Sequence, residues 1–197
     1  MAEPGVLFSD VALAQDLCAR LCHDLVGPLG TMAGAVEMVG DDPEAAELTR
    51  EATASLRGKL QLWRAACGAG TGPMRPAEMA ELLDGTLAGG RATAQVASLP
   101  PGHSFDAPAA QLLLVAAMLA GEALPRGGIV RLEPEGGGVA VRPEGRVVAW
   151  PAALAASLAG QPAEGPRAVL APMLARLAAA AGWRAALLGE ALLLRPA

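Results

Sequence analysis

The sequence predicts an α+β protein in which an N-terminal helical hairpin precedes a two-layer α/β sandwich. Apolar residues recur every three or four positions over the first part of the chain, which is the period of amphipathic helices. Beyond a stretch rich in glycine and proline, helical patterns alternate with short strand-like runs that end in glycine turns. Of the 197 residues, 53% are hydrophobic, which is enough for a folded core. We therefore expect two domains, over residues 1–70 and 71–197.

The first helix is expected from Asp10 to Val39. Its apolar residues follow the spacing of three and four positions that one buried helix face requires. They are Leu13, Leu17, Leu21, Leu25, Leu29, Met32, Val36 and Val39. Pro28 lies inside this pattern and has no N–H to bond the carbonyl of Asp24, so we expect the helix to bend there.

The second helix is expected to begin after Asp42, because Pro43 and Glu44 are typical of a first helical turn, and to end at Gly68. The residues on its inner stripe are Ala45, Leu48, Ala52, Leu56, Lys59, Trp63 and Ala66. Two antiparallel helices bury only one face against each other, and a lone hairpin of this length is marginal. We therefore expect a homodimer, in which two hairpins form a four-helix bundle.

The segment CGAGTGPMRP, residues 67–76, is expected to link the two domains. Beyond it, helices are expected over Ala77–Ala88, Ala107–Ala123, Pro151–Leu158 and Gly165–Ala181. Strands are expected over Ala92–Leu99, Ile129–Pro134, Val139–Pro143, Val147–Trp150, Trp183–Leu188 and Ala191–Arg195. Glycines at 136–138 and 189 are typical of hairpin turns, and antiparallel hairpins mixed with helices favour a two-layer sandwich.

Charge and hydropathy exclude several partners. The net charge is -5, and one lysine stands against fourteen arginines, so no basic stripe is available for nucleic acid. The N-terminus lacks the pattern of a signal peptide, and the apolar runs are shorter than the roughly 18 residues of a membrane span. We expect a cytoplasmic protein with no membrane partner. Cys18 and Cys22 lie one helical turn apart and are interpreted as small buried hydrophobic side chains, with no metal bound.

His23 is expected to face away from the buried stripe. Each helical residue advances by about 100°, which places His23 about 160° from both Leu21 and Leu25. Further glycines share its face, although each costs about 1 kcal/mol relative to alanine inside a helix. They are Gly27, Gly30 and Gly34. This pattern favours the close approach of another molecule to His23.

An exposed neutral imidazole is a competent nucleophile near neutral pH. Phosphoryl transfer to it needs mainly in-line positioning and charge neutralisation, much of which a partner with its own magnesium ion can supply. Arg20, one turn upstream, either steadies phosphate charge or forms a helix-surface pair with Asp16 or Asp24.

Two motifs resemble those of sensor histidine kinases. His23-Asp24-x-x-x-Pro28 resembles the H-box, on the first helix of a dimerisation and phosphoacceptor hairpin. Residues 111–128, QLLLVAAMLAGEALPRGG, resemble the N-box helix of the kinase ATP-binding domain. With the strings LCHDL and EALPRGG, the chain is similar to the ChpT-type histidine phosphotransferases of alphaproteobacterial phosphorelays. The resemblance implies that the sandwich is a degenerate histidine-kinase ATP-binding domain.

One departure from the kinase pattern bears on cofactors. Leu119 stands where a kinase has the asparagine that holds magnesium and ATP, and the chain contains no asparagine. A leucine cannot coordinate a hard cation, which takes oxygen ligands. No Asp-x-Gly-x-Gly lid motif is present either. We expect no cofactor and no metal on this chain, no autokinase activity, and Mg²⁺ in the partner receiver.

The resemblance implies a phosphotransferase in a multistep phosphorelay with His23 as the phosphoacceptor. His23 would take a phosphoryl group from the receiver domain of a hybrid histidine kinase and pass it to response-regulator receivers that control the cell cycle. Asp24 either orients the imidazole or is an ordinary solvated acid. The residues expected to contact the receiver are Arg20, Val26, Gly27 and Gly30. Because Gly27 can orient no water, we also expect little intrinsic phosphatase activity.

Two other functions remain open at this point. One is a non-enzymatic dimeric adaptor or scaffold with a vestigial H-box, and the other is an active ATP-dependent histidine kinase. ATP binding distinguishes the kinase, and acceptance of a phosphoryl label on His23 distinguishes the adaptor.

Overall fold

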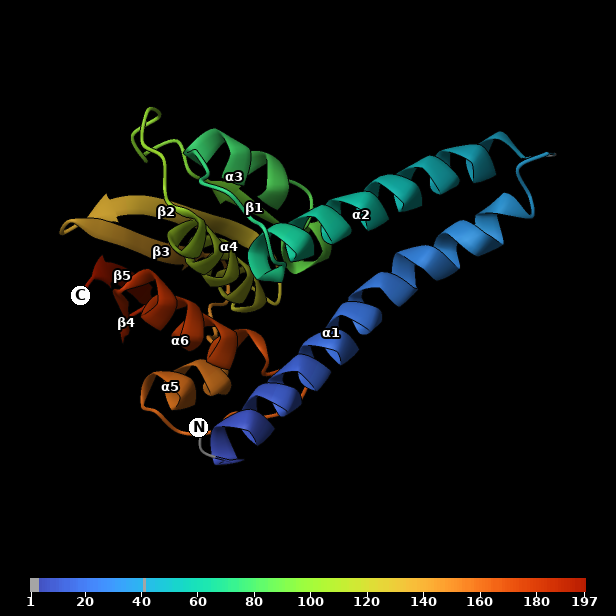
Figure 1. Cartoon of the computed structure of the whole chain (residues 1–197). Helices are drawn as coiled ribbons and strands as arrows, with labels where there is room; N and C mark the ends of the chain where they lie inside the picture. The colour runs from blue at the N-terminus through green and yellow to red at the C-terminus, as the bar shows by residue number, and fades with distance from the viewer. Residues whose placement is uncertain (1–3, 41) are drawn as a thin grey trace.

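The computed structural model describes residues 4–40 and 42–197, which form a long helical hairpin and a compact α/β body (Figure 1). The hairpin consists of α1 (Pro4–Val36) and α2 (Pro43–Cys67). The two helices meet at the tip of the hairpin and diverge toward the body, so that α2 enters the body directly while α1 runs past it to α5. The body therefore contacts both helices of the hairpin.

The helix α1 begins earlier and ends earlier than the apolar pattern predicts, because residues 37–40 form a turn instead of a last helical turn. It continues through Pro28 as one helix, so the predicted bend is not accompanied by a break. The start and end of α2 confirm the prediction. The side chain of Asp42 accepts a hydrogen bond from the Glu44 amide at 2.8 Å, and Gly68 follows the last turn.

Five helices and five strands form the described part of the body. The helices are α3 (Pro76–Leu83), the 3₁₀ helix η1 (Leu87–Gly90), α4 (Ala107–Glu122), α5 (Ala152–Leu158) and α6 (Leu170–Ala181). The strands are β1 (Ala92–Gln95), β2 (Gly128–Glu135), β3 (Gly138–Glu144), β4 (Trp183–Leu188) and β5 (Ala191–Pro196). They form one sheet in the order β1-β2-β3-β5-β4, in which only β1 and β2 are parallel. The predicted α+β class is confirmed.

The helix α4 is the centre of the core. It is buried on all sides from Ala109 to Gly121 apart from a half-buried Gln111, and it packs against α6, β2 and β3. The last turns of α2 belong to the same core, since Leu62, Trp63 and Ala66 are buried with it. A boundary at residue 70 stays a prediction, because the hairpin and the sandwich share apolar contacts there.

Several predicted elements are shorter than expected, and one strand is wrong. The apolar run Val147–Trp150 is irregular, because the Ala149 amide donates to the carbonyl of Ala123 and the Trp150 indole donates to that of Glu190. The segment crosses from β3 to α5 and pairs with none of the five described strands. The helix expected from Gly165 begins only at Leu170.

Gly127 connects α4 to β2 at a point of close packing, and we predict that alanine is poorly tolerated there. Its φ is 78°, and a Cβ would lie 2.3 Å from the carbonyl oxygen of Arg91. Gly137, in the β2–β3 turn, has nearly the same φ of 80° and nothing within 4 Å of its Cβ position. Both substitutions incur the left-handed backbone cost of about 1–2 kcal/mol.

Only Gly127→Ala adds a steric clash, so we expect it to lower the free energy of unfolding by about 2 kcal/mol more than Gly137→Ala. Urea unfolding followed by circular dichroism measures both values. Equal losses would show that the backbone of Arg91 moves aside at no cost.

Candidate functional site

His23 lies on α1 where the hairpin passes the body, and its side chain is 78% exposed. This confirms the outward orientation predicted from helical geometry. Its Nδ1 lies 3.2 Å from Oδ1 of Asp24. Because an ionised carboxylate only accepts hydrogen bonds, this contact assigns the proton to Nδ1 and leaves the lone pair on Nε2.

Arg20 connects the helix of His23 to the sandwich domain. Its Nε lies 3.1 Å from both carboxylate oxygens of Asp24, and its Nη2 lies 2.5 Å from Oε1 of Glu122. Glu122 is the last residue of α4. These contacts form a chain of charges from Glu122 through Arg20 and Asp24 to the imidazole, and the position of His23 is thereby tied to the core helix of the body.

The pKa values of two members of this chain, Glu122 and Arg20, depart from their usual values. Desolvation raises the pKa of Glu122 above its usual value, with a smaller contribution from Asp24, although Arg20 acts in the opposite direction. Desolvation also opposes the charge of Arg20, but Glu122 and Asp24 together outweigh it and raise the pKa of the guanidinium. An ionised Glu122 at this position therefore depends on Arg20.

We predict that Arg20→Ala destabilises the fold because it leaves the carboxyl of Glu122 without its partner. Both side chains are about a fifth exposed, so we expect a loss of about 1–2 kcal/mol, below that of a fully buried pair. The loss should shrink as the pH falls through the raised pKa of Glu122, since protonation removes the unpaired charge.

Two further variants make this measurement specific to Glu122. Glu122→Gln in the Arg20→Ala background should recover part of the loss, because an amide needs no counter-charge. Arg50→Ala breaks a well-exposed pair with Glu47 on α2 and should leave the urea midpoint unchanged. Equal midpoint shifts for Arg20→Ala and Arg50→Ala would contradict the structural role of Arg20.

Two cavities meet at His23. One, of about 440 Å³, lies between the hairpin and the body, and its wall includes Lys59, Trp63 and Arg91. The other, of about 920 Å³, extends along the loop at residues 164–168. The residues common to both walls are Arg20, His23, Asp24 and Glu122. The imidazole is thus largely exposed to solvent and also borders both cavities.

The face of α1 beyond His23 is open. The side chain of Val26 is 67% exposed, and a Cβ at Gly27, Gly30 or Gly34 would meet nothing within 4 Å. Arg20 differs from these residues, because its guanidinium is engaged by two carboxylates. It matches the alternative of a helix-surface pair with Asp24. Contact of Arg20, Val26, Gly27 and Gly30 with a receiver stays a prediction.

Sequence reasoning missed Glu122 and Lys59 as members of this site. Glu122 lies in the EALPRGG string, and nothing local indicates that it pairs with a residue 102 positions away. Lys59 lies on the otherwise apolar stripe of α2, where a charged side chain needs a partner, and this was the available signal. Its Nζ donates to the main-chain carbonyl of Asp24 at 3.1 Å.

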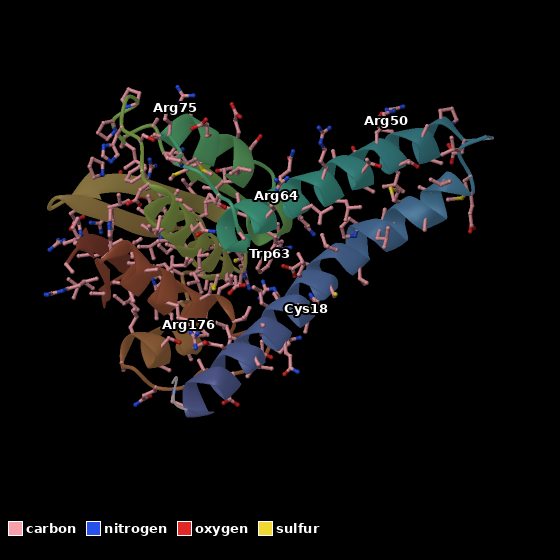
Figure 2. The ribbon with its side chains drawn as sticks, viewed as in Figure 1. Cys18, Arg50, Trp63, Arg64, Arg75 and Arg176 are labelled. Atoms are coloured by element: carbon pink, nitrogen blue, oxygen red, sulfur yellow. The ribbon has the colours of Figure 1, made fainter. Side chains whose placement is uncertain are left out.

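The cysteine prediction is wrong for α1. Cys18 and Cys22 are exposed, because α2 covers only part of the surface of α1 (Figure 2). Burial raises the pKa of the Cys67 thiol at the end of α2 to about 12.

In the described part of the chain, no group of three or more metal-ligating side chains could hold a metal ion, and no helix is long and apolar enough to cross a membrane.

The chain thus combines a helical hairpin that presents an exposed histidine with an α/β sandwich. The family model described as the histidine phosphotransferase C-terminal domain matches residues 76–188, which is more than half of the chain. The chain therefore belongs to the histidine phosphotransferase family, as its motifs predicted.

The chain is also similar to one curated protein and to one solved structure. Over 67 residues the chain is 33% identical to the protein phosphotransferase ChpT of Brucella abortus (strain 2308), a match that covers 32% of each protein. It thus spans about a third of that relative's length. A solved structure described as a bacterial phosphotransferase superposes with a TM-score of 0.74 at 21% identity, over 93% of this chain and 95% of that one. This confirms the fold of both the hairpin and the sandwich.

Proposed function

We propose that this chain carries a phosphoryl group on His23 in a multistep phosphorelay. It takes the group from the receiver domain of a hybrid histidine kinase and passes it to response-regulator receivers, among them regulators of the cell cycle. The observation that carries the proposal is the exposed His23, whose Nδ1 faces Asp24 and whose Nε2 has no hydrogen-bond partner among the described residues. Membership of the family supports the same chemistry.

The arrangement at His23 suits attack on a receiver's aspartyl phosphate. The lone pair of Nε2 forms the new P–N bond, the P–O bond to the receiver's aspartate breaks, and that aspartate leaves as a carboxylate. The proton on Nδ1 stays in place, so the product is a phosphoimidazolium whose positive charge faces Asp24. Asp24 thereby acts as the orienting residue and stabilises the charge that forms on the ring.

The partner supplies the metal in this proposal. A receiver's Mg²⁺ neutralises the charge on the transferred phosphoryl group, and this chain contributes no metal or nucleotide. Leu119, at the position of the kinase asparagine, is only 1% exposed and packs in the apolar core. The proposal therefore includes neither ATP binding nor autokinase activity.

A homodimer is part of the same proposal. Among the described side chains of α1, only Ala35 is buried, whereas large apolar residues on both hairpin helices are exposed. They include Leu29, Val36, Leu48 and Leu60. A second hairpin would cover such a face in a four-helix bundle. We place this dimer in the cytoplasm, where receivers and their kinases exchange phosphoryl groups.

Transfer from a phosphorylated receiver tests the proposal. A receiver labelled on its aspartate is mixed with the full chain, and the chain is expected to gain acid-labile, base-stable label on the peptide that contains His23. Mg-ATP is expected to give neither this label nor a thermal shift. Label that stays on the receiver, or maps to another peptide, would overturn the proposal, and a saturable shift with Mg-ATP would favour a kinase.

A further inference from the structure

Pro28 leaves one main-chain carbonyl of α1 without its helical partner. In an α-helix the amide of residue 28 bonds the carbonyl of residue 24, but proline has no N–H to donate. The helix nevertheless continues through this position. The freed carbonyl of Asp24 accepts a hydrogen bond from Nζ of Lys59, on α2, at 3.1 Å. An acceptor that α1 cannot satisfy is therefore satisfied from the opposite helix of the hairpin.

The charge of Lys59 is not balanced by a carboxylate contact. Lys59 is the only lysine of the chain and lies half-buried on α2. Within the described residues, its ammonium group contacts the Asp24 carbonyl and forms no ion pair, whereas Arg20 is held by two carboxylates. An ammonium group has three donors, so two remain available beside the bond to Asp24.

Lys59 and His23 line the same cavity of about 440 Å³, together with the carboxylates of Asp24 and Glu122. Phosphorylation of His23 adds a further group of high negative charge to this wall. In a partly desolvated site, nearby cations are needed to offset such a charge, and charge-assisted hydrogen bonds to phosphate are the strong ones. The guanidinium of Arg20 is already bonded to two carboxylates, whereas two N–H donors of the Lys59 ammonium group remain available.

We propose that Lys59 is a catalytic residue that binds the phosphoryl oxygens on His23, and that Pro28 is the residue that positions it. Pro28 frees the carbonyl of Asp24, this carbonyl holds the ammonium group of Lys59 beside the cavity, and the ammonium stabilises phosphorylated His23. No proton moves in this step, and the bonds that form and break are those of transfer between the receiver's aspartate and Nε2. The inference rests on the proposed role of His23.

The equilibrium between phosphorylated receiver and phosphorylated His23 tests this role, because a merely structural lysine would not shift it. We expect Lys59→Met to move the equilibrium toward the receiver by about tenfold and to slow transfer to His23 by a similar factor. Lys59→Arg keeps the charge and should recover most of both. Arg91→Met removes a cation from the same cavity wall without a contact to Asp24, and is the matched control.

Pro28→Ala tests whether Pro28 positions Lys59, because it leaves the charge of Lys59 in place. It restores an amide N–H that can bond the carbonyl of Asp24, and it should release Lys59 while strengthening the helix. We expect a change of about threefold in the direction of Lys59→Met, and no further change when both substitutions are combined. Pro28→Ala and Lys59→Arg are compatible with the helical backbone, so they decide the question even if Lys59→Met lowers the amount of folded chain.

The outcomes separate this inference from the proposed function. If the unsubstituted chain accepts no label on His23, the phosphotransfer proposal itself fails. If it accepts label but Lys59→Met leaves the equilibrium unchanged, or if Arg91→Met shifts it equally, Lys59 does not bind the phosphoryl group. Additive effects of Pro28→Ala and Lys59→Met would show that Pro28 does not act through Lys59.

Discussion

A His23→Ala variant is expected to accept no phosphoryl label from a phosphorylated receiver, whereas His103→Ala should accept it like the unsubstituted chain. Alanine offers no nucleophile. The other histidine, His103, lies in the turn that precedes α4, with its ring edge-on to Phe105 at a centroid distance of 4.5 Å. The two histidines are the only ones in the chain, so His103 is a matched control for loss of an imidazole.

Loss of label in His23→Ala is expected to be at least about 100-fold, because the variant lacks the imidazole that forms the covalent intermediate. Folding should be retained, since the side chain of His23 is well exposed and alanine favours a helix more than histidine does. The measurement is label on the chain after a fixed time, with thermal melts of all three proteins. Equal labelling of His23→Ala and the unsubstituted chain would remove His23 as the acceptor, and loss in His103→Ala alone would move the role to that turn.

The hairpin and the orientation of His23 could be predicted because both depend on local rules. The spacing of apolar residues fixes the inner stripe of each helix, and a residue about 160° away must point outward. The start of α2 has an equally local cause, in which the Asp42 side chain caps the first turn ahead of Pro43. These predictions need no knowledge of what packs on the helix.

Predictions failed where the outcome depends on distant partners. An apolar run such as Val147–Trp150 has the composition of a strand, but its amide and indole donors bind the carbonyls of Ala123 and Glu190, far away in the sequence. Cys18 and Cys22 were expected to be buried because they share a helix face and cysteine is a small hydrophobic residue, and they are exposed because α2 covers one side of α1 only. Sequence periodicity indicates which face is apolar, and it does not indicate how much of that face is covered.

The charged part of the site shows the same limit. The pair of Arg20 with Asp24 could be predicted from its spacing of four residues, and it was one of the alternatives. The bond of Arg20 to Glu122 and that of Lys59 to the Asp24 carbonyl join α1 to α4 and to α2. Only the folded chain brings these elements together. In the sequence alone, Pro28 indicates that the main-chain carbonyl of Asp24 lacks its helical donor, and Lys59 is a charged residue in an apolar stripe that needs a partner.

The open face of α1 gives the second large prediction, which concerns docking of the receiver. We expect Gly30→Arg to lower the rate of phosphoryl transfer to His23 by about 100-fold or more. Gly30 lies two turns beyond His23 on the same face, and the space around it is empty within the chain. A long side chain there would occupy the volume that a docked receiver needs, and a steric conflict at an interface costs a few kcal/mol, where each 1.4 kcal/mol is tenfold.

Two control variants separate docking from folding and from added charge. Gly30→Ala places only a methyl group in open space and should stabilise α1 by up to about 1 kcal/mol while transfer stays within a few-fold of normal. Gly40→Arg adds the same positive charge at the tip of the hairpin, where a Cβ is also unobstructed, and should leave transfer unchanged. Initial rates at several receiver concentrations distinguish weaker docking from slower chemistry, since a docking defect is relieved as the receiver concentration rises. Unchanged transfer by Gly30→Arg would mean that the receiver approaches His23 from the side of the two cavities, over the loop at residues 164–168, and not along the glycine face of α1.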